Sequence, residues 1–510
     1  MPKVTYGSCI FGVDYSIPPH LLPSGFLPDA QNIVPTAAGL PRGRNGCVRL
    51  NSTAQASKIT SFFEFRSGAT RNQLCSYGEA IAYYDSGTGE FVDSITGLTE
   101  GKMHQWVNFA GKAICVNEGA DPPQYWSAAD TKGALAGTPP NGLTIAEWAN
   151  RIWLGGDSTN VAKLSGCHLN DPTNWGTDGA IHGVSQTVGD SGDPIRGLYG
   201  FFDMLLVGKA NAMFKVTGAP ATDATSLDIL PVYTKDSDSV GFTSPWAITQ
   251  VGNDIIFLDG YDIKRLSGIQ EYGDIETSSI IPHFRDYLKD TVSKDYLQYT
   301  QFFHYKKAQQ IWVSIPKTAT TYLVFCLDYK FKEDTKRYSF FPMAFAEELS
   351  CFGGVEDGEL VNMYAGFEDG WVRKLDTGND DDGTAIDRYF VQVFAGNDPQ
   401  NGMTSGHENR KQFQVSDTFI KPDGTLSMTP YCALNLMDDA QVRTGSNYTA
   451  LTAETVSGWS GTGTKNKRLR FFGLNGNTLA LKWRHNTLAQ NFTFAPSVLH
   501  FDWKSTARIV

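Results

Sequence analysis

The sequence has few charged residues and lacks a long apolar run. Only 19% of its 510 residues are charged, against roughly 25% in typical soluble domains. No stretch reaches the roughly 18 apolar residues that a membrane-spanning helix needs. We expect no secretion signal, because no apolar segment follows Met1–Lys3. With 41% hydrophobic residues, the composition excludes a disordered chain and favours a folded protein without a membrane span.

An excess of basic charge is also missing, since the net charge is −11. Proteins that wrap or read nucleic acid are usually basic, because their Lys and Arg side chains displace counterions from the phosphates. A sequence-reading nucleic-acid binder is therefore disfavoured. A polymer could still pass along such a surface without binding.

Cys-x-x-Cys pairs are absent. The eight cysteines are scattered, mostly inside apolar runs such as Ile114-Cys115-Val116. This pattern is typical of buried thiols in a protein made in a reducing cytoplasm, rather than of a disulfide framework. We expect all eight to be unpaired.

Motifs of catalysis and metal binding are scarce. We find no Walker A run, no His-Glu-x-x-His and no Gly-x-Ser-x-Gly. Gly189–Pro194 is similar to the nucleophile segment of chymotrypsin-like proteases, but Asp193 replaces a glycine and no His motif precedes it, which favours a plain turn. Asn379–Gly383 has closely spaced acidic residues but lacks the spacing and closing Glu of an EF-hand, which favours a solvated linker. No two of the nine histidines have metal-ligand spacing. We expect no enzyme activity, no metal and no cofactor.

The sequence is rich in glycine, 51 residues, and in aromatic residues, 12%, which suits short strands and tight turns. A unit of turn, short apolar run, turn and second apolar run recurs at steps of 38–56 residues. The anchors of this repeat are Leu74, Ile114, Ile152, Leu205, Ile255, Ile311 and Tyr364. Such a period predicts a β-propeller with six or seven blades.

Three parts follow from these patterns. Six prolines between residues 18 and 41 predict that residues 1–50 are an extended N-terminal arm laid over something else. Residues 51–380 carry the propeller repeat, with one short helix expected at about 281–297. Residues 381–510 contain further short apolar strands, which predict an antiparallel β-sandwich. The fold class is therefore all-β, and we expect deletion of residues 1–30 to leave the propeller folded.

One basic cluster lies in the predicted sandwich. Its members are Lys465, Lys467, Arg468 and Arg470. They could contact an acidic neighbouring subunit or a phosphate, and we take them as the candidate subunit interface. The alternative is the solvated side of a hairpin.

Several segments in order resemble a known family. They are Asn32-Ile33-Val34, Gly39-Leu40 and Arg44-Asn45-Gly46, where Asn45 replaces the usual Pro, then Asn150–Gly155, Asn170–Trp175, Ile195–Leu198 and Val240–Pro245. Together they resemble the tail nozzle (tail-tube β-propeller) proteins of short-tailed bacteriophages. The resemblance covers about residues 30–280.

The resemblance implies a structural virion protein without catalysis. Such proteins form a homo-oligomeric ring, generally a hexamer, below the portal and the tail adaptor, and meet other tail proteins such as fibres or tailspikes. The ring retains the packaged DNA and guides genome ejection without sequence-specific binding. The protein would be made in the bacterial host cytoplasm and reside in the virion tail. We expect a mainly monomeric free protein that joins rings on adaptor-bearing particles.

Two other functions stay open. A propeller lectin or glycan-processing enzyme acting on the host surface would need carboxylates clustered with Arg at the propeller centre, or exposed aromatic platforms. Candidate platforms are Trp126, Trp148, Trp153, Trp175 and Trp246, although strand positions favour a place in the core. A cytosolic scaffold propeller for peptide partners is the third function.

Overall fold

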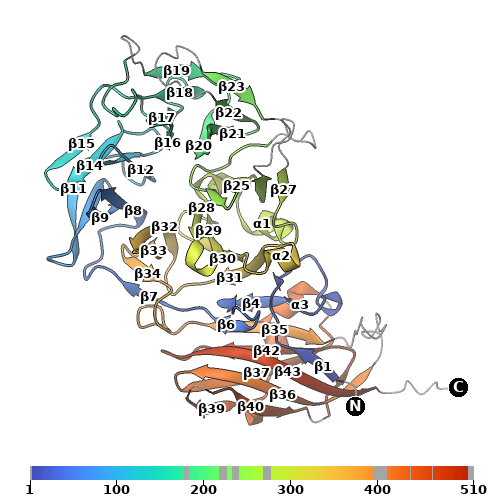
Figure 1. The fold of residues 1–510 in the computed structure, drawn as a ribbon. Coiled ribbons are helices and arrows are strands. Elements are labelled where there is room, and N and C mark those ends of the chain that lie inside the picture. Colours follow the sequence, from blue (N-terminus) through green and yellow to red (C-terminus); the bar gives the residue numbers. More distant parts are fainter. Residues whose placement is uncertain are drawn as a thin grey trace.

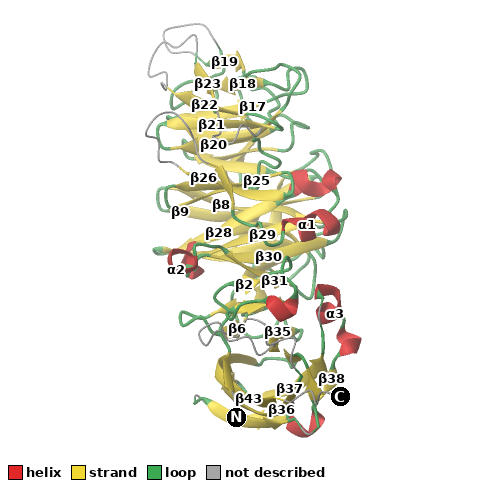
Figure 2. Ribbon diagram, turned by 90° about the vertical axis from the view of Figure 1, so that its right-hand side faces the viewer, coloured by secondary structure: helices red, strands yellow, loops and turns green. Residues whose placement is uncertain are grey.

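The computed structural model describes residues 3–176, 183–217, 227–232, 240–267, 277–394, 410–436, 438–461, 463–471 and 473–503. Strands dominate it, and they form a ring of sheets with a second group of sheets at one end (Figure 1). The expected all-β, propeller-like fold is confirmed. Figure 2 shows an elongated molecule with the second group below the ring.

Seven sheets of the described residues follow one another around the ring (Figure 1). Five consist of four consecutive antiparallel strands each. The first three are β8 (Ile59–Ser67), β9 (Thr70–Tyr77), β10 (Ala80–Asp85), β11 (Glu90–Ile95); β12 (Gln105–Phe109), β13 (Lys112–Val116), β14 (Gln124–Ala128), β15 (Thr131–Ala134); and β16 (Thr144–Trp148), β17 (Arg151–Gly155), β18 (Lys163–Gly166), β19 (Val184–Thr187). The next two are β20 (Ile195–Phe201), β21 (Met204–Lys209), β22 (Met213–Thr217), β23 (Asp228–Pro231); and β24 (Ile248–Val251), β25 (Asp254–Asp259), β26 (Asp262–Ser267), β27 (Thr277–Ser279).

The last two sheets of the ring recruit strands from the N-terminal segment. The sixth contains β28 (Gln301–Tyr305), β29 (Gln310–Pro316), β30 (Tyr322–Asp328), β31 (Ser339–Met343), β2 (Gly12–Val13) and β3 (Phe26–Leu27). The seventh contains β32 (Leu349–Asp357), β33 (Leu360–Phe367), β34 (Val372–Leu375) and β7 (Cys47–Arg49). The fourth strand of the seventh sheet therefore comes from the other end of the chain.

The repeat anchors of the sequence share one structural position. Each of the seven lies on the second strand of a different sheet, which is β9, β13, β17, β21, β25, β29 or β33. Each of these strands contains a run of buried residues, and in β17 all five residues are buried. A strand covered on both faces reads as an apolar run, which is why the repeat was visible.

Two further sheets, here called the terminal pair, lie below the ring (Figure 1). One has the order β40-β36-β43-β6-β5, with β1 on β43 and β41 on β36, and the other has the order β38-β37-β42-β35-β4, with β39 on β37. Their bounds are β1 (Lys3–Tyr6), β4 (Asp29–Gln31), β5 (Ile33–Pro35), β6 (Pro41–Gly43), β35 (Arg388–Phe394), β36 (Lys411–Asp423), β37 (Leu426–Leu434), β38 (Thr449–Ala450), β39 (Val456–Trp459), β40 (Lys465–Arg470), β41 (Asn475–Gly476), β42 (Leu479–His485) and β43 (Asn491–Trp503). The two sheets meet through aromatic side chains: the ring of Phe494 lies 5.0 Å from that of Phe390 and 5.3 Å from that of Trp483.

Helices are short throughout the described residues. They are α1 (Arg285–Thr291), α2 (Lys332–Thr335), α3 (Asp439–Arg443) and the 3-10 turns Pro19–Leu21, Lys294–Tyr299, Lys306–Ala308, Gly445–Asn447 and Thr452–Glu454. The helix expected at about 281–297 is divided into α1 and a 3-10 turn. No described helix has the length and apolar character to cross a membrane.

Residues 3–49, predicted to be an extended arm laid over something else, instead form short strands that belong to the sheets. Their strands pair with β31, β34, β35 and β43, so one short segment joins four sheets. The prolines prevented long strands but not strands of two to four residues. Pro35 and Pro41, for example, face each other at the end of the β5–β6 hairpin, where a missing N–H is tolerated.

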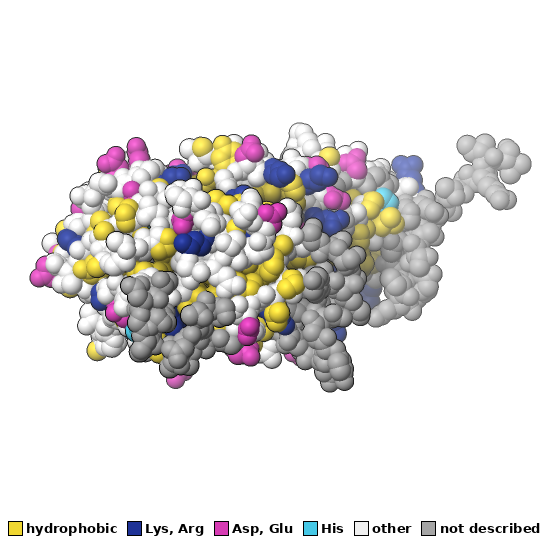
Figure 3. All heavy atoms as spheres, turned by 90° about the horizontal axis from the view of Figure 1, so that it is seen from above, with side chains coloured by type: hydrophobic (Ala, Val, Ile, Leu, Met, Phe, Trp, Pro, Cys, Tyr) yellow, Lys and Arg dark blue, Asp and Glu magenta, His cyan; other side chains and the backbone are white. Residues whose placement is uncertain are grey.

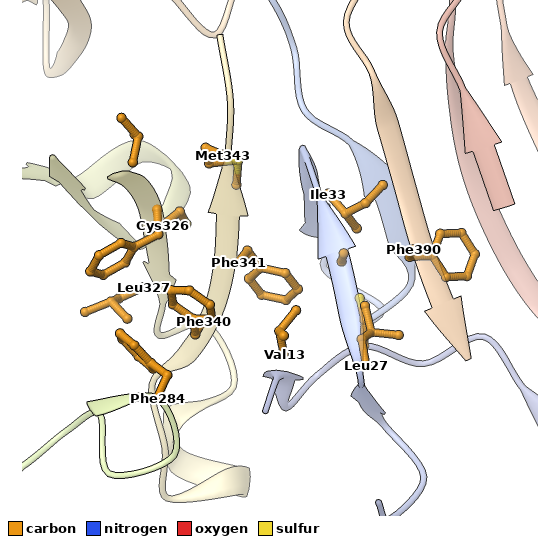
Figure 4. Close-up of a cluster of buried hydrophobic side chains, with 14 of the residues drawn as sticks. Val13, Leu27, Ile33, Phe284, Cys326, Leu327, Phe340, Phe341, Met343 and Phe390 are labelled. Atoms are coloured by element: carbon orange, nitrogen blue, oxygen red, sulfur yellow. The ribbon is translucent and has the colours of Figure 1, made fainter. Parts of the chain in front are cut away.

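The N-terminal strands also fill the space between the ring and the terminal pair. Figure 4 shows Val13, Leu27 and Ile33 between Phe341 of β31 and Phe390 of β35. All five side chains are fully buried and belong to one hydrophobic cluster. The ring and the terminal pair therefore share a core that residues 3–49 complete.

All eight cysteines are unpaired and buried. Burial raises the pKa of the Cys351 thiol to about 12 and that of Cys167 to about 11, so neither is a thiolate at neutral pH. We expect the melting temperature to be the same with and without reductant. A fall of more than a few degrees in reductant would contradict this, because a native disulfide is worth about 2–5 kcal/mol.

Candidate functional site

The first strand of each sheet faces the centre of the ring, because the first strands of neighbouring sheets contact one another, as β8 does with β12 and β32. The centre is bridged by side chains. The indole Nε1 of Trp246 donates to the carbonyl of His104 at 3.2 Å, and Nε2 of Gln105 donates to the carbonyl of Pro245 at 3.3 Å. These bonds tie the second sheet to the segment that leads into the fifth. Side chains therefore span the centre of the ring at this level.

His104 is buried at this bridge. Burial lowers the pKa of its imidazole to about 4, so the ring is neutral at pH 7. In the unfolded chain the pKa would be about 6.5. Below pH 6.5 the unfolded state therefore binds more protons than the folded state. The free energy of unfolding falls by about 3 kcal/mol between pH 7 and pH 4 for this reason.

We expect His104→Gln to weaken this pH dependence. Urea unfolding at pH 7 and pH 4.5 should show a smaller loss of stability in the variant than in the wild type. The partly exposed Gln250 provides the control variant Gln250→Asn, which should keep the wild-type slope because it removes no ionisable group. Equal slopes for all three proteins would contradict this origin of acid sensitivity.

Carboxylates and arginines do gather near the ring centre, where β8 meets β32. Glu64 Oε2 lies 2.9 Å from Arg66 Nε, and Glu356 Oε2 lies 3.0 Å from Arg71 Nη2. Arg66 also binds Glu356, and Arg71 Nη1 lies 3.5 Å from Glu64. Each carboxylate is therefore bound by both arginines. The cluster links the first and last sheets rather than leaving a carboxylate available for acid–base work.

A buried polar cluster, here called the hub, lies where the β5–β6 hairpin meets the ring and the terminal pair. The guanidinium of Arg44 donates to both oxygens of Asp381, at 2.8 Å and 2.6 Å, and to Asn32 Oδ1 at 2.8 Å. The side chains of Arg44 and Asp381 are only 3% and 4% exposed. A buried, bidentate and fully hydrogen-bonded pair is costly to break.

Asn32 and Gly46 shape the backbone around that pair. Asn32 has a φ of 57°; its Oδ1 also accepts from the Ala344 N–H at 2.8 Å, and its Nδ2 donates to the Asp387 carbonyl at 2.8 Å. A Cβ at Gly46 would lie 1.7 Å from the carbonyl oxygen of Asp380. Only glycine fits there. The backbone geometry and hydrogen bonds of the hub therefore account for both Asn32 and Gly46, which belong to the segments quoted above for the family resemblance.

Arg388 of β35 completes the hub. Its guanidinium donates to the carbonyls of Arg44 at 3.0 Å, Asn379 at 2.8 Å and Gln490 at 2.8 Å. Burial, followed by the nearby Arg44, lowers its pKa to about 10, which leaves it charged at neutral pH. The arginine therefore ties the N-terminal hairpin to the segment between β34 and β35 and to the residue that precedes β43.

Asn379–Gly383 is part of the hub and not a solvated linker. Asp381 is held by Arg44, while Asp382 binds Arg49 and lies 3.7 Å from Arg373 Nε. The linker interpretation was wrong because the arginines that neutralise these carboxylates come from remote parts of the chain. Within the described ranges, no three His, Cys, Asp or Glu side chains gather in a way that could hold a metal ion.

The four basic residues of β40 do not share a face. In register with β36, Arg468 and Arg470 lie opposite Asp417 and Val415 on the outer side, whereas Lys465 and Lys467 point to the other side. Arg468 binds both oxygens of Asp417 at 2.7 and 2.9 Å, and Lys467 lies 3.3 Å from Glu454. β40 is an edge strand, where charged side chains also prevent edge-to-edge pairing.

The other residues singled out in the sequence have structural places. Gly189–Pro194 is a turn that the buried Lys209 holds through the Asp190 carbonyl. Trp126, Trp148 and Trp153 are buried on strands, and Trp175 and Trp246 are partly buried. Hydrophobic and charged side chains of both signs are mixed on the face in Figure 3, so the described residues there show no separate acidic patch.

No protein-family model and no curated protein matches the chain. Selenomethionine-substituted virginiamycin B lyase from Staphylococcus aureus is similar over 64% of this chain and 98% of its own, with 14% identity and a TM-score of 0.41. The RRP9 WD40 repeats are similar over 66% and 99%, with 7% identity and a TM-score of 0.42. BamB from Moraxella catarrhalis is similar over 68% and 95%, with 14% identity and a TM-score of 0.37. The likeness concerns the propeller-like fold alone.

Proposed function

We propose that the chain is a nozzle subunit in the tail of a short-tailed bacteriophage. Its ring of copies would lie below the portal and adaptor, close the DNA channel and guide the genome out at infection. The hub is the observation that carries the proposal, because Asn32, Arg44 and Gly46, on which the family resemblance rests, converge there. The segment that contains these residues joins the ring of sheets to the terminal pair, which suits a rigid tail component.

The finer architecture belongs to this proposal. We take the seven sheets as the blades of a seven-bladed β-propeller, closed by β7 of the N-terminal segment. We take the terminal pair as an antiparallel β-sandwich. The position of all seven repeat anchors on second strands and the pairing of β7 with β34 support this.

The DNA channel would lie between subunits. The bonds from Trp246 and Gln105 bridge the centre of one chain's ring, so DNA would pass through the opening that the copies surround. The net charge of −11 favours sliding over binding. The outer face of β40, with Arg468 and Arg470, is the proposed contact for an acidic neighbour, such as the adaptor or a fibre protein.

Particles assembled without this protein test the function. We expect them to package DNA and then lose it, and labelled antibody against the chain should bind the tail end of wild-type virions. Retained genomes and full infectivity without the chain would contradict the proposal. Cleavage of host glycans by the purified protein would favour the enzyme function instead.

A further inference from the structure

Phe202 is an exposed aromatic residue on a strained turn. It is 67% exposed, more than any other large hydrophobic side chain of the described residues. It lies in the two-residue turn between β20 and β21, where Phe201 pairs with Met204. Its φ is 50°, in the left-handed region that bulky residues avoid.

The other sheets show that this turn does not need a large residue. Two-residue turns also join the first and second strands of five other sheets. In three of them, as at Phe202, only the first turn residue has a positive φ, and that residue is Gly68, Gly252 or Gly358. A Cβ at each of these glycines would meet nothing within 4 Å. The backbone of this turn therefore favours glycine at this position, and the phenylalanine adds strain. The ring of Phe202 contacts that of Phe201, with 4.5 Å between the ring centroids, and the rest of the side chain faces solvent.

A pocket that could receive this ring lies on the opposite face of the ring of sheets. Its volume is about 180 Å³, and its lining includes Ile59, Met103, Tyr296, Tyr299 and Pro316. Ile59 begins β8, Met103 precedes β12 and Pro316 ends β29. These positions lie at the end of the sheets away from the turn that carries Phe202, so a chain cannot fill its own pocket.

Charge complements the apolar fit. Asp203, next to Phe202, is exposed and has no ion-pair partner in the described part of the chain. Lys58 lines the pocket with a side chain that is 36% exposed, 3.5 Å from Glu368. Asp203 of one copy would approach Lys58 of the next as the phenyl ring enters.

We infer that Phe202 inserts into this pocket of a second copy of the same chain. A knob and a pocket on different faces make a heterologous contact, which closes into a ring when the rotation permits. The inference rests on the proposed ring of copies and names the contact within it. A single ring in a small pocket gives a weak contact, which suits a subunit that assembles on a template.

The variant Phe202→Gly separates the two roles of this residue. We expect its thermal midpoint to rise, because the strain is relieved, while its self-association in a sedimentation concentration series falls at least tenfold. Leu360→Ser, which removes another exposed apolar side chain at a turn of the seventh sheet, should associate like the wild type. Phe202→Gly that associates like the wild type would overturn the contact.

Cross-linking gives a second readout. Because all native cysteines are buried, and because Asp203 lies next to Phe202 and the exposed Ala319 lines the pocket, a mixture of Asp203→Cys and Ala319→Cys proteins should form a dimer with a short bismaleimide while Phe202 is retained. A mixture of Leu360→Cys and Ala319→Cys proteins should not. Absence of this dimer at the highest protein concentrations tested overturns the contact, whether or not the wild-type protein is mainly monomeric. Rings seen in virion tails would then still support the nozzle function, whereas their absence would count against the function itself.

Discussion

Removal of residues 1–50 is expected to abolish cooperative folding. The truncated chain would lose β1–β7, and with them the fourth strand of the seventh sheet and the partners of β31, β35 and β43. Three of the side chains that would be lost, Val13, Leu27 and Ile33, are fully buried. Together they contribute about 5–9 kcal/mol to the free energy of unfolding, at roughly 1.5–3 kcal/mol each. Total stabilities of domains are only about 5–15 kcal/mol.

Circular dichroism melts and soluble yield measure this outcome. Co-expression of residues 1–50 as a separate polypeptide is the control, and we expect it to restore soluble protein, since the segment pairs through many hydrogen bonds. A truncated chain with a wild-type melting curve would show that these strands do not stabilise the fold. That result would support the separable arm that the sequence predicted.

Arg44→Ala should cause the largest loss of stability of any single substitution at the hub, about 3–5 kcal/mol. The change leaves the carboxylate of Asp381 buried without its bidentate partner and removes a donor from Asn32 Oδ1. The ring and the terminal pair would then be joined more loosely. Urea unfolding measures the loss.

Arg468→Ala is the matched control for Arg44→Ala. Arg468 also binds an aspartate through two hydrogen bonds, but its side chain is 60% exposed. Exposed ion pairs contribute little, so its unfolding curve should match that of the wild type. Equal losses of unfolding free energy for the two substitutions would mean that burial of the Arg44–Asp381 pair does not determine its contribution to stability.

The sequence was sufficient for the strands of the ring because each buried second strand is a short apolar run between turns. Ile152 and Ile255, for instance, are fully buried on β17 and β25. Such local patterns need no knowledge of distant residues. The cysteines and the strand tryptophans could be placed in the core for the same reason.

The hub and the N-terminal pairings could not be predicted, because their partners are remote. Arg44 and Asp381 are separated by 337 residues, and nothing local distinguishes Asp381 from a residue of a solvated acidic loop. β2 and β3 have two residues each, too few for a periodic pattern. The basic residues of β40 lie on two faces: Arg468 and Arg470 on one, Lys465 and Lys467 on the other. This division follows from the strand register, which could not be known from the positions of the basic residues in the sequence.

Electron microscopy of the protein bound to its adaptor tests the nozzle assignment most directly. We expect rings, generally sixfold, whose central opening lies between subunits and is wide enough for duplex DNA, with density filling the centre of each subunit's own ring of sheets. Discrete monomers that never join the adaptor, or a DNA path through the centre of a single chain's ring, would contradict the account.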